Sequence, residues 1–557
     1  MLRVNARYRS LVVSCLCLLS LAGSSAWAQP PRGPRGRTGP TQTGLLVNRA
    51  DAYPGYTLYA PLNSTTTYLI DLAGTVVHAW SSQYTPGQAV YLLDDGSLLR
   101  GAREPRLRHF GGGGIGGRVE RLAPDGKVLW EFVYANDEHC LHHDIEPLPN
   151  GNVLMIAWEK KTADEAIAAG YDPDQLFGDE LWPDCIIEVA PRGPHEGEIV
   201  WEWHVWDHLV QDFDESKSNF GDVAAHPELV NLNYRRVAPR ETPAEIHRLR
   251  ALGYVGGPES DDEDEDQPGP RPPGPRGFGG GDPRADWCHT NSVAYNARLD
   301  QIALSVHTFN EIWIIDHSTT TREAASHAGG RYGHGGDLLY RWGNPRAYGA
   351  GTARDQQLFA QHDARWIPEG FPGAGHLLVF NNGGGRPGGQ YSSVVEIVPP
   401  LEANGSYTLA RGQAYGPSKP CWEYTHARKR EFFSHSVSGA ERLPNGNTLV
   451  CAGEQGWMLE VTPAGETVWE YVNPHSERRG PDEPAGPPGA APTSQPRRRP
   501  PMPPPGGGLG RAGGPPPGGP PGMGGPASGS VFRASRFAAD HPGIKLLLGA
   551  HYSQVSP

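Results

Sequence analysis

Histidines recur just ahead of apolar, strand-like segments of this chain. Four stretches share the arrangement: LHHDIEPLPNGNVLMIAW (141–158), WCHTNSVAYNARLDQIALSV (287–306), QHDARWIPEGFPGAGHLLVF (361–380) and SHSVSGAERLPNGNTLVCAG (434–453). Neutral imidazole is a nucleophile, a general acid or base near pH 7, and a metal ligand. The residue types alone do not separate these three uses.

The candidate site residues share a position near the start of a predicted strand, and they are His142 or His143, His289, His362 and His435. Asn291 is two residues beyond His289, on the same face of a strand, and its amide suits an anionic oxygen. Asp144 and Asp363 each follow a histidine directly. Each acid is able either to orient an imidazole or to cap a turn.

A repeated unit of strands accounts for this spacing. Six segments close on an aromatic residue, at 74–80, 126–132, 197–203, 336–342, 419–424 and 465–471. Each follows a segment that alternates apolar and polar residues, as a half-buried strand does, with a glycine turn between them in most copies. Six units predict an all-β fold, a six-bladed β-propeller with helical and disordered insertions. The innermost strands of a propeller start near one mouth of its channel, so we expect the histidines to converge there.

Composition divides the chain into domains. Its 73 glycines and 55 prolines concentrate in three tracts, residues 29–41, 256–285 and about 478–530, which lack the apolar residues for a core. We therefore predict a signal peptide (1–28), a disordered linker (29–44), the propeller (45–477), a disordered tract (478–530) and a C-terminal tail (531–557). The propeller carries an insertion at 204–285, of which 256–285 is disordered, and a capping box at residues 242–245 predicts a helix that ends before Gly253.

The amino terminus predicts export, to the periplasm or to the medium. Three early arginines precede an apolar run and the small-residue site Ala26-Trp27-Ala28. The mature chain would keep five cysteines, which makes at least one disulfide an expectation in an oxidising compartment. Their spacing does not match a zinc site, and the net charge of −13 argues against a nucleic-acid partner. We expect no cofactor, no metal and no membrane span.

The stretch DWCHTNSVAYN, with NEIWIIDHSTTT, GDLLYRWGNP, QHDARW and LPNGN, resembles the bacterial arylsulfotransferases of the arylsulfate sulfotransferase type, from about residue 66 to 474. The resemblance implies an exported six-bladed propeller that moves a sulfuryl group from an aryl sulfate to a phenol through a sulfated histidine, without a nucleotide sulfate donor. It implies that His362 is sulfated, that His289 and Asn291 contact the sulfuryl group, and that His142 or His143 is a further active-site histidine.

One position departs from that family. Where characterised members carry an arginine after the strand that follows His-x-Asn, this chain has His307, which replaces an arginine fork only in part and only when protonated. Along with His435, His307 is a candidate for substrate binding. Two other functions stay open: a propeller enzyme that holds a divalent metal on its histidines, such as a polysaccharide lyase, and a non-catalytic binding propeller.

Overall fold

The computed structural model describes residues 39–107, 109–176, 178–234, 283–410, 412–475 and 529–549. The chain divides into two units, residues 1–37 and 38–557, and all described residues belong to the second. The predicted signal peptide, the helix predicted at 242–253 and nearly all of the three Gly/Pro-rich tracts lie outside the described residues.

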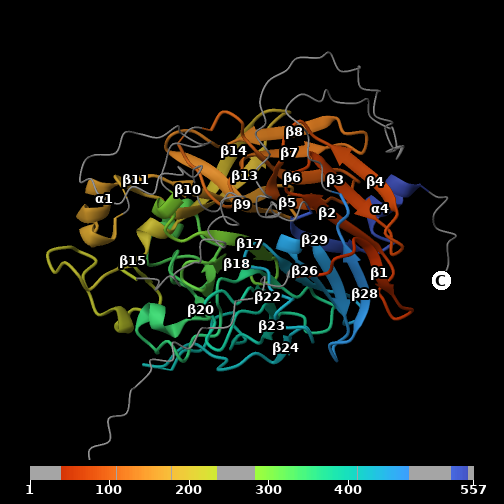
Figure 1. Ribbon diagram of the computed structural model, residues 1–557. Helices are drawn as coiled ribbons and strands as arrows, with labels where there is room; N and C mark the ends of the chain where they lie inside the picture. The colour runs from red at the N-terminus through yellow and green to blue at the C-terminus, as the bar shows by residue number, and fades with distance from the viewer. Residues whose placement is uncertain are drawn as a thin grey trace, which may run out of the picture. The chain divides into compact units, whose positions relative to one another are not determined.

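Six antiparallel sheets confirm the predicted six-bladed β-propeller (Figure 1). From the innermost strand outward, the first three blades are β29 (Val531–Phe537), β2 (Tyr56–Pro61), β3 (Thr66–Ile70), β4 (Val76–Ser81); β5 (Pro86–Leu92), β6 (Leu98–Arg103), β7 (Gly117–Leu122), β8 (Val128–Val133); and β9 (His139–Pro147), β10 (Val153–Glu159), β13 (Asp184–Pro191), β14 (Gly197–His204). The other three are β17 (Thr290–Asn296), β18 (Gln301–Val306), β19 (Glu311–Asp316), β20 (Tyr340–Trp342); β21 (His362–Trp366), β22 (Leu377–Asn381), β23 (Ser393–Ile397), β24 (Trp422–Tyr424); and β25 (Gly439–Arg442), β26 (Thr448–Ala452), β27 (Trp457–Val461), β28 (Thr467–Val472), β1 (Gly44–Asn48). The innermost strands contact one another in the closed cycle β29, β5, β9, β17, β21, β25.

Both ends of the described chain close this ring. Strand β1 pairs with β28 as a fifth strand of the last blade, and β29 pairs with β2 as the innermost strand of the first. The prediction of a C-terminal tail at 531–557 is therefore wrong for residues 531–548. Val531 and Phe532 are buried, and helix α4 (Pro542–Leu548) packs Ile544 into the first blade's core. A lone strand after a long Gly/Pro tract has no partner nearby in the sequence, so its pattern does not reveal its sheet.

Tryptophans at the ends of the repeats fasten neighbouring blades together. Five indole N–H groups donate to a carbonyl in the outer turn of the next blade: Trp130 to Glu196, Trp203 to Gly336, Trp342 to Pro417, Trp422 to Pro463, and Trp469 to Leu72. In the first blade, His78 Nε2 lies 3.0 Å from the equivalent carbonyl, that of Pro124. Each such bond contributes about 1 kcal/mol. Each of these five tryptophans is the closing aromatic residue of its repeat or lies two residues before it, so the sequence repeat carries the contact between blades.

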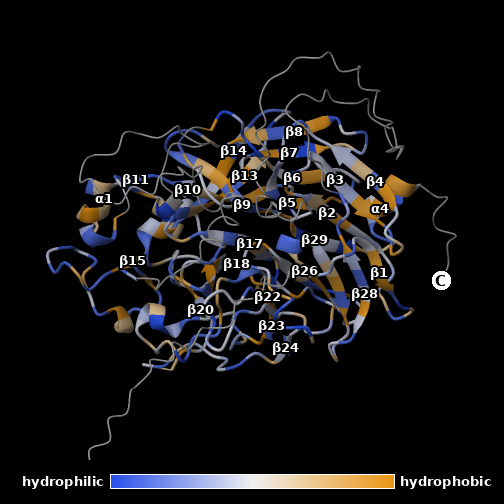
Figure 2. Ribbon diagram, in the orientation of Figure 1, coloured by the Kyte–Doolittle hydropathy of each residue, from blue (hydrophilic) through white to orange (hydrophobic). Residues whose placement is uncertain are grey.

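Short elements fill the connections: α1 (Ala163–Ala168), α3 (Thr321–Ala324), β11 (Lys161–Thr162), β12 (Glu180–Leu181), β15 (Leu209–Val210), β16 (Val230–Asn231), η1 (Pro173–Gln175), η2 (Val205–Asp207), η3 (Val223–Ala225), η4 (Pro283–Ala285), η5 (Pro345–Tyr348) and η6 (Gly453–Gln455). The described part of the predicted insertion 204–285 contributes the parallel pair β15 and β16. Figure 2 shows hydrophobic and hydrophilic segments in most labelled strands. Among the described residues, no helix combines the length and apolar character needed to cross a membrane.

The cysteines contradict the expected disulfide. Cys140, Cys185, Cys288, Cys421 and Cys451 are all unpaired, and Cys421 alone of the five is exposed. Burial raises the pKa of the Cys140 and Cys288 thiols above its usual value, which makes both poor nucleophiles. Their proximity to the candidate histidines is therefore structural.

Candidate active site

Three innermost strands break their regular pairing where the candidate residues lie. The pairing of β9 with β10 skips residues 142–144, that of β17 with β18 skips Asn291, and that of β21 with β22 skips residues 363–364. His143, His289 and Asp363 have left-handed backbones, with φ of 53°, 52° and 57°. Bulges of this kind redirect side chains that would otherwise alternate between the faces of a strand. A left-handed backbone costs about 1–2 kcal/mol at each such residue. This strain is tolerated where consecutive side chains must lie on the same face of the strand.

Four imidazoles lie in a row across the blades of β9, β17 and β21. The ring centroids of His143 and His289 are 4.5 Å apart, those of His289 and His307 are 5.0 Å apart, and those of His307 and His362 are 5.4 Å apart. His143 and His362 are buried. The His289 side chain is 13% exposed, and His307 is also partly accessible. An incoming molecule would therefore meet His289 and His307 first.

His362 is held as one neutral tautomer. Its Nδ1 lies 2.9 Å from Asn382 Oδ1 and 3.3 Å from the Ala360 carbonyl, and both are acceptors, so Nδ1 carries the proton. Asn382 is oriented in turn, because its Nδ2 donates to the carbonyls of Ser434 and Val437. Burial is the main cause that lowers the pKa of His362, to about 3. The unprotonated Nε2 has no hydrogen-bond partner among the described residues, which leaves a lone pair available for attack.

His289 has the environment of an acid or base. Its Nδ1 lies 2.5 Å from Asp286 Oδ2, and Asp286 Oδ1 accepts hydrogen bonds from the His289 backbone N–H and from the Trp158 indole. A carboxylate fixed in this way orients the imidazole. Sequence analysis missed Asp286, although it lies only three residues before His289.

His142 and His143 differ in role. His143 faces His289, while the His142 ring stacks on Trp158 with centroids 4.2 Å apart. Their Nδ1 atoms are 2.8 Å apart, so the two rings share one proton between them. Burial, together with the neighbouring histidines, lowers the pKa of His143 well below its ordinary value. Gly114 covers this ring, since a Cβ there would lie 2.1 Å from it.

Hydrogen bonds between neighbouring innermost strands show which repeat positions are equivalent. Asp144 Oδ2 accepts from Val293 N, Ser292 Oγ from Ala364 N, and Asp363 Oδ2 from Ala440 N. Asp144, Ser292 and Asp363 therefore occupy equivalent positions in their blades. The residues directly before them, His143, Asn291 and His362, are equivalent to one another in the same way. The prediction that four histidines share one position is therefore wrong for His289 and His435, which lie earlier in their repeats. The bulges differ in size from strand to strand, so equal spacing in the sequence does not give equivalent positions in the blades.

Asn291 and His435 lie differently from what the sequence suggested. Asn291 is buried, and its Nδ2 donates to the Gln361 carbonyl, so its Oδ1, not its amide N–H, lacks a partner among the described residues. His435 is not one of the four rings in the row. Its backbone N–H donates to Glu454 and its ring centroid is 6.0 Å from that of Phe433.

A buried arginine on β29 lies between the two Asp residues that follow histidines. Arg533 forms two hydrogen bonds of 2.7 Å with Asp144 and one of 3.2 Å with Asp363. Burial opposes its charge, but Asp144, Tyr91 and Asp363 raise the pKa of Arg533 well above its ordinary value. Because Asp144 adjoins His143 and Asp363 adjoins His362, this cation fixes the strands that carry both histidines. Sequence analysis missed it by treating its segment as a tail.

The described cavities and metal-capable clusters lie elsewhere. One cavity, of about 580 Å³, is lined by residues that include Trp206, Lys217 and His327. Within the described part of the chain, the groups able to hold a metal are His208, His327 and Asp337, and His376, Glu396 and Cys421. The row of four histidines is in neither group.

Comparisons with known proteins bear on this site. Solved structures with a similar trace include a protein of unknown function from Bacteroides caccae (11% identity, 75% of this chain and 94% of that chain, TM-score 0.34). They also include the Cps50 (Swd1) β-propeller domain from Myceliophteria thermophila (11%, 80% and 90%, 0.32) and virginiamycin B lyase from Staphylococcus aureus (8%, 77% and 88%, 0.32). These scores are too low to carry an argument. A search of curated proteins found no match. A family model described as arylsulfotransferase (ASST) matches residues 49–475, a range that includes every histidine of the row, and this chain belongs to that family of sulfotransferases.

Proposed function

We propose that this protein transfers a sulfuryl group from an aryl sulfate to a phenol, with His362 as the covalent carrier. Membership of the family supports sulfuryl transfer in general. The observation that supports His362 as the carrier is its tautomer: Nδ1–H is bound by Asn382 and Ala360, and Nε2 is buried and unprotonated. A nucleophile poised as a lone pair needs no deprotonation before it attacks.

In the first half-reaction the His362 Nε2 lone pair attacks sulfur and the bond from sulfur to the aryl oxygen breaks. The ring becomes cationic, and Asn382 Oδ1 and the Ala360 carbonyl stabilise that charge through Nδ1–H. Protonated His289, held by Asp286, gives its Nε2 proton to the departing aryl oxygen.

In the second half-reaction His289 takes the proton of the acceptor phenol. The phenol oxygen attacks sulfur, the bond from sulfur to Nε2 breaks, and both histidines return to their starting states. The sulfuryl group has then moved from the donor to the acceptor phenol, and one proton has moved from the acceptor phenol to the departing phenol. Protonated His307, between His289 and His362, would hold the sulfuryl oxygens where the family carries an arginine.

We further propose that the protein acts outside the cytoplasm after removal of residues 1–28, because its first residues have the pattern of a secretory signal. An exported enzyme that needs no nucleotide donor is independent of cytoplasmic cofactor supply.

Phenol release in the absence of an acceptor tests the proposal. An aryl sulfate with a coloured phenol should give a rapid burst of about one phenol per chain, followed by slow turnover, since transfer to the enzyme precedes transfer to the acceptor. His362→Asn should abolish the burst, and the matched variant His435→Asn should retain it. A linear time course that depends on acceptor from the first turnover would contradict the covalent route.

A further inference from the structure

Three side chains converge outside the row of histidines, on two connections between strands. His208 follows η2, and His327 and Asp337 lie between β19 and β20. Asp337 Oδ1 is 2.8 Å from His208 Nδ1 and 2.7 Å from His327 Nδ1. All three atoms lie within 4.8 Å of one another. Two imidazole nitrogens and one carboxylate oxygen are a donor set that first-row divalent metals bind.

The other nitrogen of His208 is held by a backbone carbonyl. His208 Nε2 is 2.8 Å from the Ala324 carbonyl, which can only accept, so Nε2 bears the proton. Its Nδ1 is directed at Asp337 Oδ1, 2.8 Å away. Histidines that bind metals commonly donate their other N–H to a backbone carbonyl in this way.

The surroundings hold His208 in one orientation. The ring is buried and stacks on Trp203, with centroids 5.7 Å apart and planes 5° apart. Gly336 packs so closely that a Cβ there would lie 2.6 Å from His208 Nε2, and the Gly336 carbonyl accepts the Trp203 indole N–H. Little reorganisation is therefore needed when an ion arrives.

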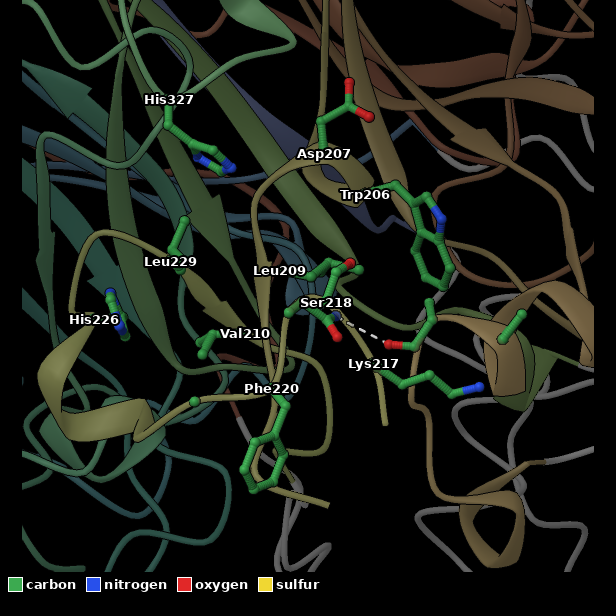
Figure 3. Close-up of a pocket in the computed structure, with 14 residues that line it drawn as sticks. Trp206, Asp207, Leu209, Val210, Lys217, Ser218, Phe220, His226, Leu229 and His327 are labelled. Carbon is green, nitrogen blue, oxygen red and sulfur yellow. Dashed lines mark hydrogen bonds between the residues drawn. The ribbon is translucent and has the colours of Figure 1, made fainter. Parts of the chain in front are cut away.

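We propose that His208, His327 and Asp337 form a site for a first-row divalent cation. An ion about 2.1 Å from both His208 Nδ1 and Asp337 Oδ1, which are 2.8 Å apart, would have a ligand–ion–ligand angle of about 84°. This angle is close to the 90° between adjacent ligands in octahedral coordination. The His327 side chain is 61% exposed and lines the 580 Å³ cavity with Trp206 and Lys217 (Figure 3). The remaining coordination positions are thus open to water or to a small anion in that cavity.

The site would strengthen one contact between blades. His208 comes from the connection after β14, and the other two ligands come from the connection before β20, where Trp203 already latches onto Gly336. A bound ion joins these two connections directly. Since neither connection contributes to the row of histidines, removing the ion should lower thermal stability and leave sulfuryl transfer unchanged.

Calorimetric titration of ZnCl₂ into the full-length, EDTA-dialysed protein tests this proposal. We expect one tight site per chain and an affinity lowered about 10- to 100-fold or more in His327→Ala and Asp337→Asn. Zinc should raise the Tm of the wild type but not of these two variants. His226→Ala is the matched control, because His226 is an exposed histidine that lines the same cavity and pairs with Glu228 instead.

Two results would overturn the proposal. The first is zinc binding that is absent, or equal in the wild type and His327→Ala, which would mean adventitious binding to other histidines. The second is loss of sulfuryl transfer on EDTA treatment, which would place the ion at the row of histidines instead.

Discussion

Asn382 sets the tautomer of His362, and replacing it by alanine should slow formation of the sulfated enzyme. The side chain accepts from His362 Nδ1 at 2.9 Å and donates to two backbone carbonyls. A hydrogen bond to a neutral group contributes about 0.5–1.5 kcal/mol, and one to a charged group about 1.5–3 kcal/mol. The ring becomes cationic during attack, so the loss is larger in the transition state than in the resting enzyme.

These magnitudes predict that Asn382→Ala lowers the labelling rate about 10- to 100-fold, as 1.4 kcal/mol corresponds to a factor of ten. The assay is rapid quenching after mixing with aryl sulfate, followed by intact-mass measurement of the labelled fraction. The variant will also unfold more easily, because the Ser434 and Val437 carbonyls lose their donor.

Asn381→Ala is the control for that loss of stability. Asn381 is the buried neighbour of Asn382. It accepts one backbone N–H, from Phe359, and donates to one backbone carbonyl, that of Gln357. It does not touch His362, so folded Asn381→Ala should label at nearly the wild-type rate. Equal rates in both variants would refute the role of Asn382.

Four further predictions follow from the same contacts. The pKa of His362 is about 3 in the folded protein and near 6.5 in the unfolded chain, so the stability that the neutral ring contributes is complete above pH 6.5 and is lost as the pH falls toward 3. His362→Asn should therefore reduce the slope of unfolding free energy against pH, between pH 6 and 4, by up to about 1.4 kcal/mol per pH unit. An unchanged slope would contradict the buried, neutral state of His362. Lysine lacks the planar guanidinium that lets Arg533 bind Asp144 and Asp363 together, so Arg533→Lys should lower the labelled fraction per folded molecule. Arg536 is a buried arginine of the same strand that pairs with Glu460 instead, so Arg536→Lys should lower only Tm. Deletion of residues 258–282 should leave Tm and transfer unchanged, and a drop of several degrees would show that this tract contributes to the fold. Thiol titration of the denatured mature chain should find five free thiols; three would reveal a disulfide that the structure does not contain.

The sequence predicted the blades because each repeat carries its own evidence. Alternation, a turn and a closing aromatic residue recur in each repeat, and tryptophans at that closing position or two residues before it bond to the next blade. The segment at 531–537 gave no such evidence, because its partner strand β2 lies more than 470 residues earlier. Closure of the ring is a long-range contact that local periodicity does not encode.

The site was predictable in composition but less so in geometry. His143, His289 and His362 do converge, since the starts of innermost strands lie close together, and His307 joins them from the end of β18. Their relative positions were not predictable, because bulges of one to three residues change the register of each strand separately. Asn382 and Arg533 were missed for another reason: they act on the histidines from other strands, and neither neighbours a histidine in the sequence.

Mass mapping of the sulfated enzyme is the most direct test of the central claim. After aryl sulfate is supplied without acceptor, the chain should gain ~80 Da, and fragmentation should place the added mass on His362. The mass should disappear when phenol is added, and it should never appear in His362→Asn. Stable label on another residue of the row, such as His143 or His289, or full transfer activity in His362→Asn, would contradict the account.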